Sequence, residues 1–234
     1  MSGTVEVGIL SARDASPAAD GGADRLHLVR RTQAGPMAPE LREVAAVRAR
    51  TDLPLRVTVR LREGFSTDGG EVVRLRGLVG AYLDAGADGV VLGFLNGLGA
   101  IDREVIATVL AESACGWTFS RAIDTCLEVD LAWSVLLGLP RLEGVQTAGS
   151  ARTLEHGLDD LLRRARSTPA AAALMIADGQ LRPEQVPWLV RAGVSQFHLD
   201  DQVRPGGSER AYVDERLVGS WRRLIDAESG RTER

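Results

Sequence analysis

Hydrophobic and polar residues follow two different periods along this chain, and the two periods take turns. Over residues 55–60, Leu55, Val57 and Val59 alternate with arginine and threonine, which is the period of two expected for a strand. Residues 116–120 show the same alternation. Longer stretches with a helical period lie between such segments. The pattern therefore predicts strands and helices in regular alternation.

Eight strand–helix units can be counted in this way. Strands are predicted at residues 5–9, 26–29, 55–60, 89–92, 116–120, 144–147, 171–176 and 195–199. Helices are predicted at residues 13–19, 39–50, 70–85, 102–112, 129–139, 152–166, 183–192 and 209–227. The units repeat at a spacing of roughly 25 residues, as a (β/α)8 barrel requires.

A recurring phrase marks the step from helix to strand. It occurs as Asp-Gly-Gly-Ala-Asp at 20–24, Asp-Ala-Gly-Ala-Asp at 84–88 and Arg-Ala-Gly-Val at 191–194. Its glycine suits the left-handed position after a helix. The competing fold is an open, doubly wound sheet, which usually has fewer strands and a glycine-rich turn after the first one. Residues 9–13 contain no such turn. We therefore predict an α/β protein with a single (β/α)8 (TIM) barrel.

Length and composition agree with one domain. The chain has 234 residues, 44% of them hydrophobic and 26% charged. We expect the barrel to occupy residues 1–228 and residues 229–234 to form a disordered tail. The net charge of −4 gives no basic footprint for nucleic acid, and no apolar run is long enough to cross a membrane. Cys115 and Cys126 suit free thiols in a reducing compartment, so we expect a soluble cytoplasmic protein.

Polar residues stand at or near the carboxyl ends of the predicted strands, where such a barrel carries its site. In chain order they are Glu6, His27, Arg60, Arg62, Ser120, Arg121, Asp124, Gln146, Thr147, Asp178, His198, Asp200 and Asp201. A buried ring with charges of both signs is too unfavourable to serve packing alone. We therefore predict a pocket for a small polar ligand or substrate.

Four members of this ring are candidate catalytic residues. Arg60 and Arg121 would stabilise an oxyanion, and Glu6 or Asp124 would act as the acid or base. Of the two carboxylates, Asp124 is better placed in the sequence to orient Arg121. The alternative for Glu6 is a structural ion pair with Arg60 or Arg121 inside the barrel.

The other candidates would bind the ligand. They are His27, Arg62, Ser120, Thr147, Asp178, His198 and Asp200. Either histidine could carry a proton, or both could be ordinary residues of half-buried strands. The pair Asp200–Asp201 could instead cap a loop.

The charges divide between two sides of the ring. Arg60, Arg62 and Arg121 belong to the third to fifth strands, whereas Asp178 and Asp200 follow the last two. We expect the anionic end of a ligand at the arginines and a hydroxyl, amine or cation at the aspartates. The aspartates argue against the phosphate site that many barrels form after their last strands.

The residues give metal binding little support. The chain has no CxxC, His-x-His or HExxH motif. Cys115 and Cys126 flank the fifth strand at opposite ends, whereas Cu(I) prefers two or more nearby sulfur ligands. A hard divalent ion at Asp178, Asp200 and Glu6 is a weaker alternative. We assign no metal ligand from the residues themselves.

Several short motifs are specific in combination. They are Val5-Glu6-Val7, Gly22-Ala-Asp-Arg25, Gln33-Ala-Gly-Pro-Met-Ala-Pro39, Arg60-Leu-Arg62 with Gly64-Phe65, Thr118-Phe-Ser-Arg-Ala-Ile-Asp124 with Cys126, Thr147-Ala-Gly149 and Arg191-Ala-Gly193. Together they make the chain similar to the CutC family, named for copper homeostasis, from about residue 5 to residue 227. The resemblance implies a cytoplasmic, usually oligomeric TIM barrel. It also implies family site positions, which are Glu6, Arg60, Arg62, Arg121, Asp124 and Thr147.

This chain departs from the family pattern at several positions. Ser120 stands where histidine is usual, His27 where glutamate is usual, and Gly8 and Ile9 where cysteine is frequent. The family implies Cu(I) as a ligand, but these changes leave few soft donors for it. The resemblance therefore indicates a divergent member with a retained scaffold and an altered site.

Three functions stay open. The first is a copper-homeostasis protein that binds Cu(I). The second is a metal-independent lyase, isomerase or hydrolase acting on a small, anionic, oxygen-rich metabolite. The third is a non-catalytic scaffold or regulator. We expect a homo-oligomer, in which Trp133, Trp188 and Trp221 would build the interface unless they pack on the barrel.

Overall fold

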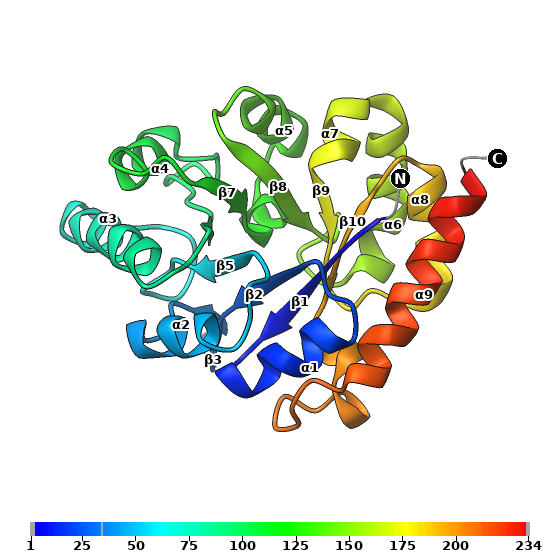
Figure 1. The fold of residues 1–234 in the computed structure, drawn as a ribbon. Helices are drawn as coiled ribbons and strands as arrows, with labels where there is room; N and C mark the ends of the chain where they lie inside the picture. The colour runs from blue at the N-terminus through cyan, green and yellow to red at the C-terminus, as the bar shows by residue number, and fades with distance from the viewer. Residues whose placement is uncertain (1–2, 34, 233–234) are drawn as a thin grey trace.

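The computed structural model describes residues 3–33 and 35–232 and shows a closed barrel of parallel strands surrounded by helices (Figure 1). The order around the ring is β1-β2-β5-β6-β7-β8-β9-β10. The bounds are β1 Thr4–Ile9, β2 Arg25–Leu28, β5 Leu55–Thr58, β6 Gly89–Leu92, β7 Gly116–Phe119, β8 Leu142–Thr147, β9 Met175–Ala177 and β10 Gln196–Leu199. The predicted (β/α)8 barrel is confirmed.

The helices follow the strands on the outside of the ring. Their bounds are α1 Ala15–Asp20, α2 Leu41–Arg48, α3 Gly69–Asp84, α4 Arg103–Val109, α5 Val129–Leu137, α6 Leu154–Ser167, α7 Pro169–Leu174, α8 Val186–Arg191 and α9 Glu215–Thr232. Short 3₁₀ segments are η1 Ala12–Asp14, η2 Arg121–Thr125, η3 Pro183–Gln185, η4 Asp201–Val203 and η5 Pro205–Gly207.

The recurring junction phrase has the backbone that its glycine predicts. Gly22, Gly86 and Gly193 have φ angles of 93°, 101° and 96°, in the left-handed region that residues with a Cβ rarely adopt. Each glycine ends a helix and turns the chain into the next strand. These glycines are the reason that the strand–helix repeat can be recognised in the sequence.

One predicted strand was wrong for most of its length. Residues 171–176 were expected to form the seventh strand, but α7 occupies residues 169–174 and β9 begins only at Met175. The run of four alanines at 170–173 has the highest helix propensity, and Pro169 starts the first turn with a favourable φ. The segment is apolar throughout, which also fits a short buried strand, and Ala171 and Ala172 are buried in the structure.

Two further segments differ from the prediction. An antiparallel hairpin, β3 Arg30–Thr32 with β4 Gly35–Met37, lies between β2 and α2, where no element was predicted. The closing helix begins at residue 215 and not at the predicted residue 209. The turns η4 and η5 occupy residues 201–207 before it. The helix also runs to residue 232, past the predicted domain end at 228. Ser229 is buried there, close to Gly3 just before β1, and residues 233–234 lie outside the described residues.

The interior of the barrel near the amino ends of its strands is polar. Arg56 points into it, forms an ion pair with Glu143 and donates from Nη1 to the carbonyl of Gly116 at 2.9 Å. Gly89 makes room for this side chain, since a Cβ there would lie 1.6 Å from Nη1 of Arg56. Arg25 enters the same region from β2. Arginines therefore replace part of the branched aliphatic layer that usually fills such a barrel.

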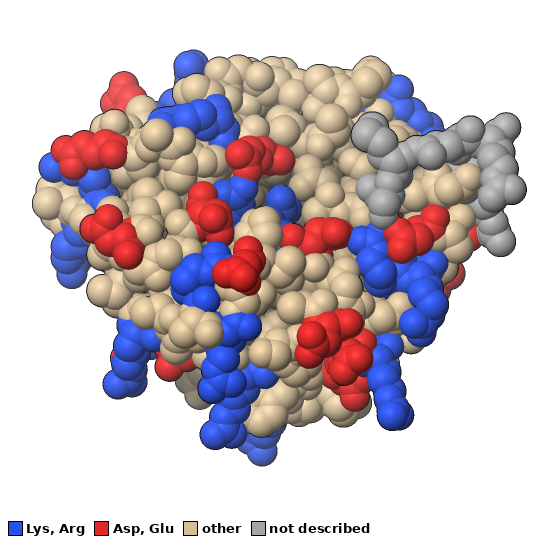
Figure 2. Space-filling view, in the orientation of Figure 1, with Lys and Arg blue, Asp and Glu red and all other residues tan. Residues whose placement is uncertain are grey.

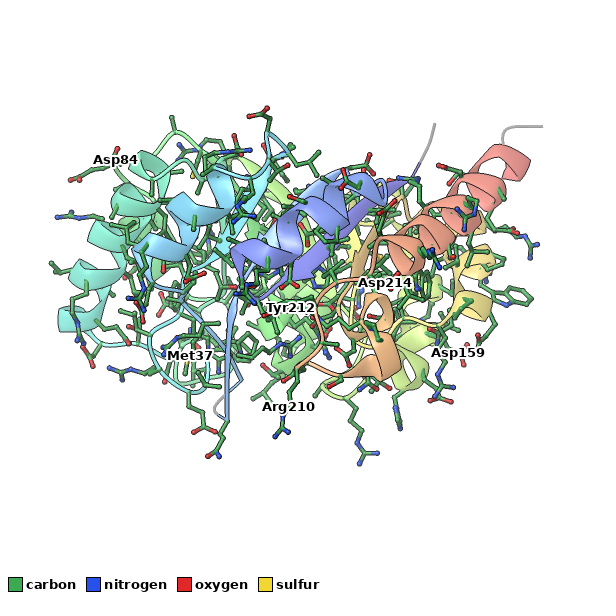
Figure 3. The ribbon with its side chains drawn as sticks, turned by 60° about the horizontal axis from the view of Figure 1, so that its bottom comes forward. Met37, Asp84, Asp159, Arg210, Tyr212 and Asp214 are labelled. Atoms are coloured by element: carbon green, nitrogen blue, oxygen red, sulfur yellow. The ribbon has the colours of Figure 1, made fainter. Side chains whose placement is uncertain are left out.

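Charged side chains of both signs are interspersed over the face shown in Figure 2. The loops that follow the strands lie on the other side of the barrel. In Figure 3, Met37 and Arg210 lie at the lower edge, on this carboxyl-terminal side, whereas Asp84 at the end of α3 lies at the upper edge. The strand ends that carry the predicted site therefore open on the Met37 side.

Substitution of Gly89 by alanine tests how tightly Arg56 packs in the barrel interior near the amino ends of the strands. The new Cβ would clash with Arg56 and with the carbonyl oxygen of Gly116, 2.3 Å away, so we expect Gly89→Ala to lower the free energy of unfolding by about 3 kcal/mol. The matched control is Gly80→Ala in α3, where nothing lies within 4 Å of the added atom. It should raise stability by roughly 0.5–1 kcal/mol. Urea unfolding of both variants measures the difference, and equal effects would contradict the packing described.

Candidate functional site

A cavity of about 490 Å³ lies at the carboxyl ends of the barrel strands. Its lining comes from β2, β5, β6, β8 and β10, from the hairpin strands β3 and β4, and from the loops that follow the barrel strands. Eight of the predicted site residues line it, namely His27, Arg60, Ser120, Arg121, Asp124, Asp178, His198 and Asp200. Glu6 lies beneath it, while Thr147 and Arg62 lie outside the lining. Strands far apart in sequence thus bring most of the predicted residues to one mouth.

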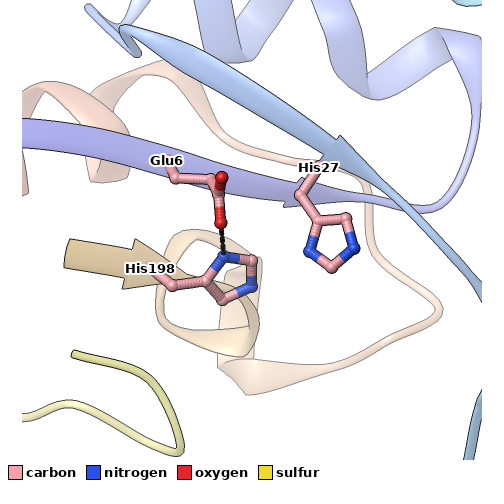
Figure 4. Close-up of side chains that lie close together, drawn as sticks. All are labelled: Glu6, His27 and His198. Atoms are coloured by element: carbon pink, nitrogen blue, oxygen red, sulfur yellow. Dashed lines mark hydrogen bonds and ion pairs between the residues drawn. The ribbon is translucent and has the colours of Figure 1, made fainter. Parts of the chain in front are cut away.

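Glu6 is a fully buried carboxylate held by donors from three other strands. Its Oε2 accepts a hydrogen bond from Nε of Arg25 at 2.6 Å. Its Oε1 accepts from Nδ1 of His198 at 2.8 Å (Figure 4). The same oxygen accepts from Nε2 of Gln146 at 3.1 Å. Sheet register makes these contacts possible, because β1 places Glu6 beside Arg25 on β2 and beside His198 on β10.

The ion-pair partner that was suggested for Glu6, as the alternative to a catalytic role, was wrong. The sequence suggested Arg60 or Arg121, which both lie higher, at the mouth. Arg25 stands at the start of β2 and reaches Glu6 from the amino-terminal side of the barrel. The strand pattern carried one signal for it, since Arg25 and His27 are two residues apart and therefore share a face.

His27 has both ring nitrogens occupied. Its Nε2 lies 2.7 Å from Oγ1 of Thr58, and its Nδ1 lies 3.1 Å from Nε2 of Gln146. The amide nitrogen of Gln146 donates to Glu6, so its second hydrogen is available to His27, and Nδ1 of His27 accepts it. His27 is therefore neutral, with its proton on Nε2 pointing to Thr58. Its ring meets that of His198 edge to face, with centroids 5.4 Å apart.

Burial and charge pull the pKa values of these groups apart. Burial would raise the pKa of Glu6, but Arg25 and the hydrogen bond from His198 hold it well below its usual range. Burial lowers the pKa of His27 to about 4. Burial also lowers the pKa of His198, but the charge of Asp178 and the hydrogen bond to Glu6 outweigh it, so the pKa of His198 is raised. Of the two buried histidines, His198 is therefore the one that is protonated more readily.

Asp124 holds Arg121 in place. The Asp124 carboxylate accepts from Nε of Arg121 at 2.9 Å, from Oγ1 of Thr147 at 2.6 Å and from the backbone nitrogen of Ala148 at 2.9 Å. Nη2 of Arg121 donates to the carbonyls of Ser150 and Arg152, both at 2.9 Å. Three donors thus hold a carboxylate that is almost fully buried. These contacts suit orientation of Arg121 and give Thr147 a supporting position behind the pocket.

Arg60 is the arginine with unused capacity at the mouth. Its guanidinium stacks on Phe65, 4.8 Å from the ring centroid, and its Nε donates to the carbonyl of Arg62 at 3.0 Å. Among the described residues no carboxylate lies within ion-pair distance of it. Half-burial lowers its pKa from the usual arginine value, and it stays charged. Glu63 is the carboxylate whose charge acts on Arg60, but it forms no ion pair with it, so the half-buried guanidinium can still bind an anion.

Arg62 and Asp200 differ from their predicted roles. Arg62 points away from the pocket and pairs with Asp68 and with Glu71 at 2.7 Å. Asp200 pairs with Arg31 from the β3–β4 hairpin, which also approaches Glu209 at 3.5 Å. No pattern in the sequence indicated this contact, because it depends on the β3–β4 hairpin, which was not predicted. Arg31 reduces the negative charge expected on that side.

Glu6, His27 and His198 are also the one group in the described part of the chain whose donor atoms could meet at a metal ion, within 4.8 Å of one another. They do not fit Cu(I), which prefers sulfur. Both oxygens of Glu6 and both nitrogens of His27 already have hydrogen-bond partners, and Arg25 places a positive charge beside the carboxylate. We therefore assign no metal to these residues.

The two cysteines do not supply the missing soft ligands. Cys126 is buried, its Sγ lies 3.7 Å from the carbonyl of Ala122, and it is not part of the pocket lining. Burial, with the charge of Asp124, raises the pKa of its thiol to about 11, which disfavours the thiolate that binds metal. Cys115 precedes β7 at the other end of the barrel, beside Ser113. The structure keeps the thiols apart, as the sequence predicted.

Comparison with known proteins decides the family. The sequence model of the CutC family matches residues 4–203. A CutC family protein of Xanthomonas campestris pv. campestris (strain 8004) is 31% identical over 198 residues, which are 83% of this chain and 81% of the relative. The chain belongs to the CutC family.

Solved structures agree with the CutC fold. CutC of Streptococcus agalactiae, assigned provisionally to copper homeostasis, superposes with a TM-score of 0.74 at 18% identity over 84% of this chain and 97% of its own. Thiamine phosphate pyrophosphorylase of Pyrococcus furiosus superposes with a TM-score of 0.60 at 16% identity, over 96% of each chain. At these identities the likeness shows the barrel alone.

Two expectations about the surroundings of this CutC-family chain can be compared with its structure. In the described ranges, 3–33 and 35–232, no helix is long and apolar enough to span a membrane. Of the three tryptophans considered for an interface, Trp133 and Trp221 are buried, whereas Trp188 is 51% exposed beside Arg191. Trp133 and Trp221 therefore pack on the barrel, and the homo-oligomer stays a prediction.

The depressed pKa of His27 predicts a loss of stability in mild acid. The folded-state pKa is about 4 against 6.5 for the free group, so the unfolded chain binds more protons between these values. The His27 contribution is complete above pH 6.5, and the free energy of unfolding falls by roughly 3 kcal/mol as pH drops to 4. Urea unfolding from about pH 4 to about pH 7.5 measures this slope. It should flatten in His27→Gln and persist in His156→Gln, an exposed control; parallel curves for all three would refute the assignment.

The donor set predicts weak Cu(I) binding. Titration with Cu(I) against a competing chelator should show no tight site in the parent protein and no difference in Cys126→Ser, because the buried thiol is protonated and has no nearby sulfur partner. A tight site that disappears in Cys126→Ser would reverse this conclusion.

Proposed function

We propose that this CutC-family protein is a metal-independent enzyme that transfers a proton on a small, anionic, oxygen-rich metabolite, as a lyase, isomerase or hydrolase. The observation that carries the proposal is the Glu6–His198 pair. A buried carboxylate fixes Nδ1 of His198 as the donor at 2.8 Å, and Nε2 is left without a partner among the described residues. An imidazole held in this way is a ready general acid or base.

The pocket leaves space beside the free nitrogen of His198. A Cβ at residue 8 would lie 3.1 Å from Nε2 of His198 and 3.1 Å from Oδ1 of Asp200. Gly8 has no such atom, so a ligand group can approach both. This spacing supports a substrate whose reacting atom lies between the imidazole and a hydrogen-bonding carboxylate.

The charges that stay unpaired indicate how a substrate would lie. Arg121 is held by Asp124, and Arg31 is held by Asp200. Arg60 follows the third strand of the ring and Asp178 follows the seventh, so they stand on opposite sides of the mouth. We place the substrate's anionic group at Arg60 and a hydroxyl or amine at Asp178, with His198 near Asp178.

This orientation keeps the predicted division of the pocket into an arginine side and an aspartate side, but it uses fewer residues. Arg62 is left out because it points away from the pocket. Ser120 and Arg121 stay as candidates for the anionic side, and Asp124 acts through Arg121. A pocket of about 490 Å³ suits a metabolite of modest size.

The link to copper homeostasis rests on membership of the CutC family and on the description of the Streptococcus agalactiae relative. For this chain the donor chemistry favours proton transfer over direct Cu(I) binding. A scaffold or regulator has no need of a carboxylate that is fully buried under a polar pocket. A cytoplasmic location and a homo-oligomer stay predictions.

Hydrogen–deuterium exchange tests the proposal even while the natural substrate is unidentified. We would incubate the protein in D₂O with glycolate, lactate, tartrate and gluconate, and follow the signal of the C–H next to the carboxylate by NMR. We expect catalysed exchange for at least one of these acids. His198→Gln should lose the exchange by at least about 100-fold while the protein stays folded.

The anion site is tested in the same assay. Arg60→Gln should raise the acid concentration needed for half-maximal exchange by about tenfold or more, because it removes the unpaired cation. Arg42→Gln is the control, since Arg42 is an exposed residue paired with Glu40 outside the pocket. Failure of all four acids to exchange would rule out proton abstraction next to the carboxylate of these acids, and equal exchange in His198→Gln would overturn the role of His198.

A further inference from the structure

Two arginines project into the barrel from neighbouring strands. Arg25 on β2 and Arg56 on β5 have side chains only 12% and 7% exposed, and each forms an ion pair with a glutamate. The glutamates differ. Glu143, the partner of Arg56, is 50% exposed, whereas Glu6 is fully buried and also contacts His198. Arg25 is thus the arginine that is connected to the mouth.

We propose that Arg25 is a positioning residue of the site, which sets the proton affinity of the Glu6–His198 pair from below. The inference rests on the proposed function for its catalytic meaning, but the coupling itself can be measured without any substrate. Nothing in the sequence prediction assigned Arg25 to the site.

The contacts divide the Glu6 carboxylate between two tasks. Oε2 receives Nε of Arg25 at 2.6 Å, and Oε1 receives Nδ1 of His198 at 2.8 Å with Gln146 at 3.1 Å. Arg25 is steadied from behind, where Nη2 donates to Oε1 of Gln196 at 3.2 Å. A carboxylate fixed at both oxygens cannot rotate away from the imidazole. The arrangement therefore aligns His198 and keeps Glu6 ionised.

Other charged groups face the pair, and none of them replaces Arg25. His27 is neutral and lies on the β2 side, and Asp178 adds negative charge above His198. Arg31 also lies above, where Asp200 neutralises it. Arg25 is thus the cation in direct contact with the carboxylate.

Electrostatics fixes the sign of the expected effect. Removal of a positive charge beside a coupled acid–base pair makes that pair hold its proton more tightly, whichever member carries it. Loss of Arg25 should therefore raise the pKa at which His198 is titrated. The pair would then stay protonated to a higher pH, and less of His198 would be in the unprotonated form that can accept a proton.

Histidine NMR provides the measurement. The chain contains only His27, His156 and His198, so signals of the labelled imidazoles can be assigned from His27→Gln and His156→Gln. In Arg25→Met we expect the pKa of His198 to rise by about one pH unit or more. Arg56→Met is the matched control, with the same substitution at a similarly buried arginine whose side chain binds Glu143 and the carbonyls of Asp88 and Gly116 instead of the Glu6–His198 pair. It should leave the pKa of His198 within about 0.3 pH unit of the parent.

A second variant covers the case in which Arg25→Met does not fold, since it leaves Glu6 without a counterion. Arg25→Met combined with Glu6→Gln removes both charges, and the pKa of His198 should then fall below that of the parent protein. Equal His198 pKa values in Arg25→Met and Arg56→Met would overturn the inference, as would an unchanged value in the double variant. If the shifts appear but no acid exchanges deuterium, the coupling stands and the proposed reaction fails.

Discussion

The structure depends on one buried carboxylate at the axis of the barrel. An ionised Glu6 without water is strongly unfavourable unless donors surround it. The barrel supplies three, from Arg25 on β2, Gln146 on β8 and His198 on β10. These contacts hold only in one register of β1 against its two neighbours. The hydrogen bonds that stabilise the buried Glu6 carboxylate therefore also align the imidazole of His198, which we propose as the acid–base group.

A polar interior changes what the rest of the barrel must provide. Arg56 crosses the amino-terminal end of the barrel, and Gly89 gives it room. At the mouth, Asp124 accepts hydrogen bonds from three residues and fixes the direction of Arg121. Most charges near the axis are thereby neutralised in pairs. The few that are not, above all Arg60, stand out as groups that a ligand would contact.

Family membership and site chemistry answer different questions in this protein. Similarity over most of the chain places it in the CutC family, whose name refers to copper. The donor atoms that meet beneath the mouth are oxygen and nitrogen, and all except Nε2 of His198 already have hydrogen-bond partners among the described residues. Cys126 is held away from them as a protonated thiol. The scaffold is shared with relatives, while the chemistry follows from the residues that this chain has placed on it.

The sequence by itself determined the barrel and the gathering of polar strand ends, because both follow from local signals. Periods of two and of about 3.6, and a left-handed glycine after a helix, act within a few residues, and parallel strands in a ring bring their carboxyl ends together. Where a local signal was ambiguous, as in the alanine run before Met175, the prediction failed. Only the tertiary structure decided which charges pair. Glu6 contacts Arg25 and not Arg60, and Arg62 turns outward to Glu71, because reach and register across strands distant in sequence select the partner.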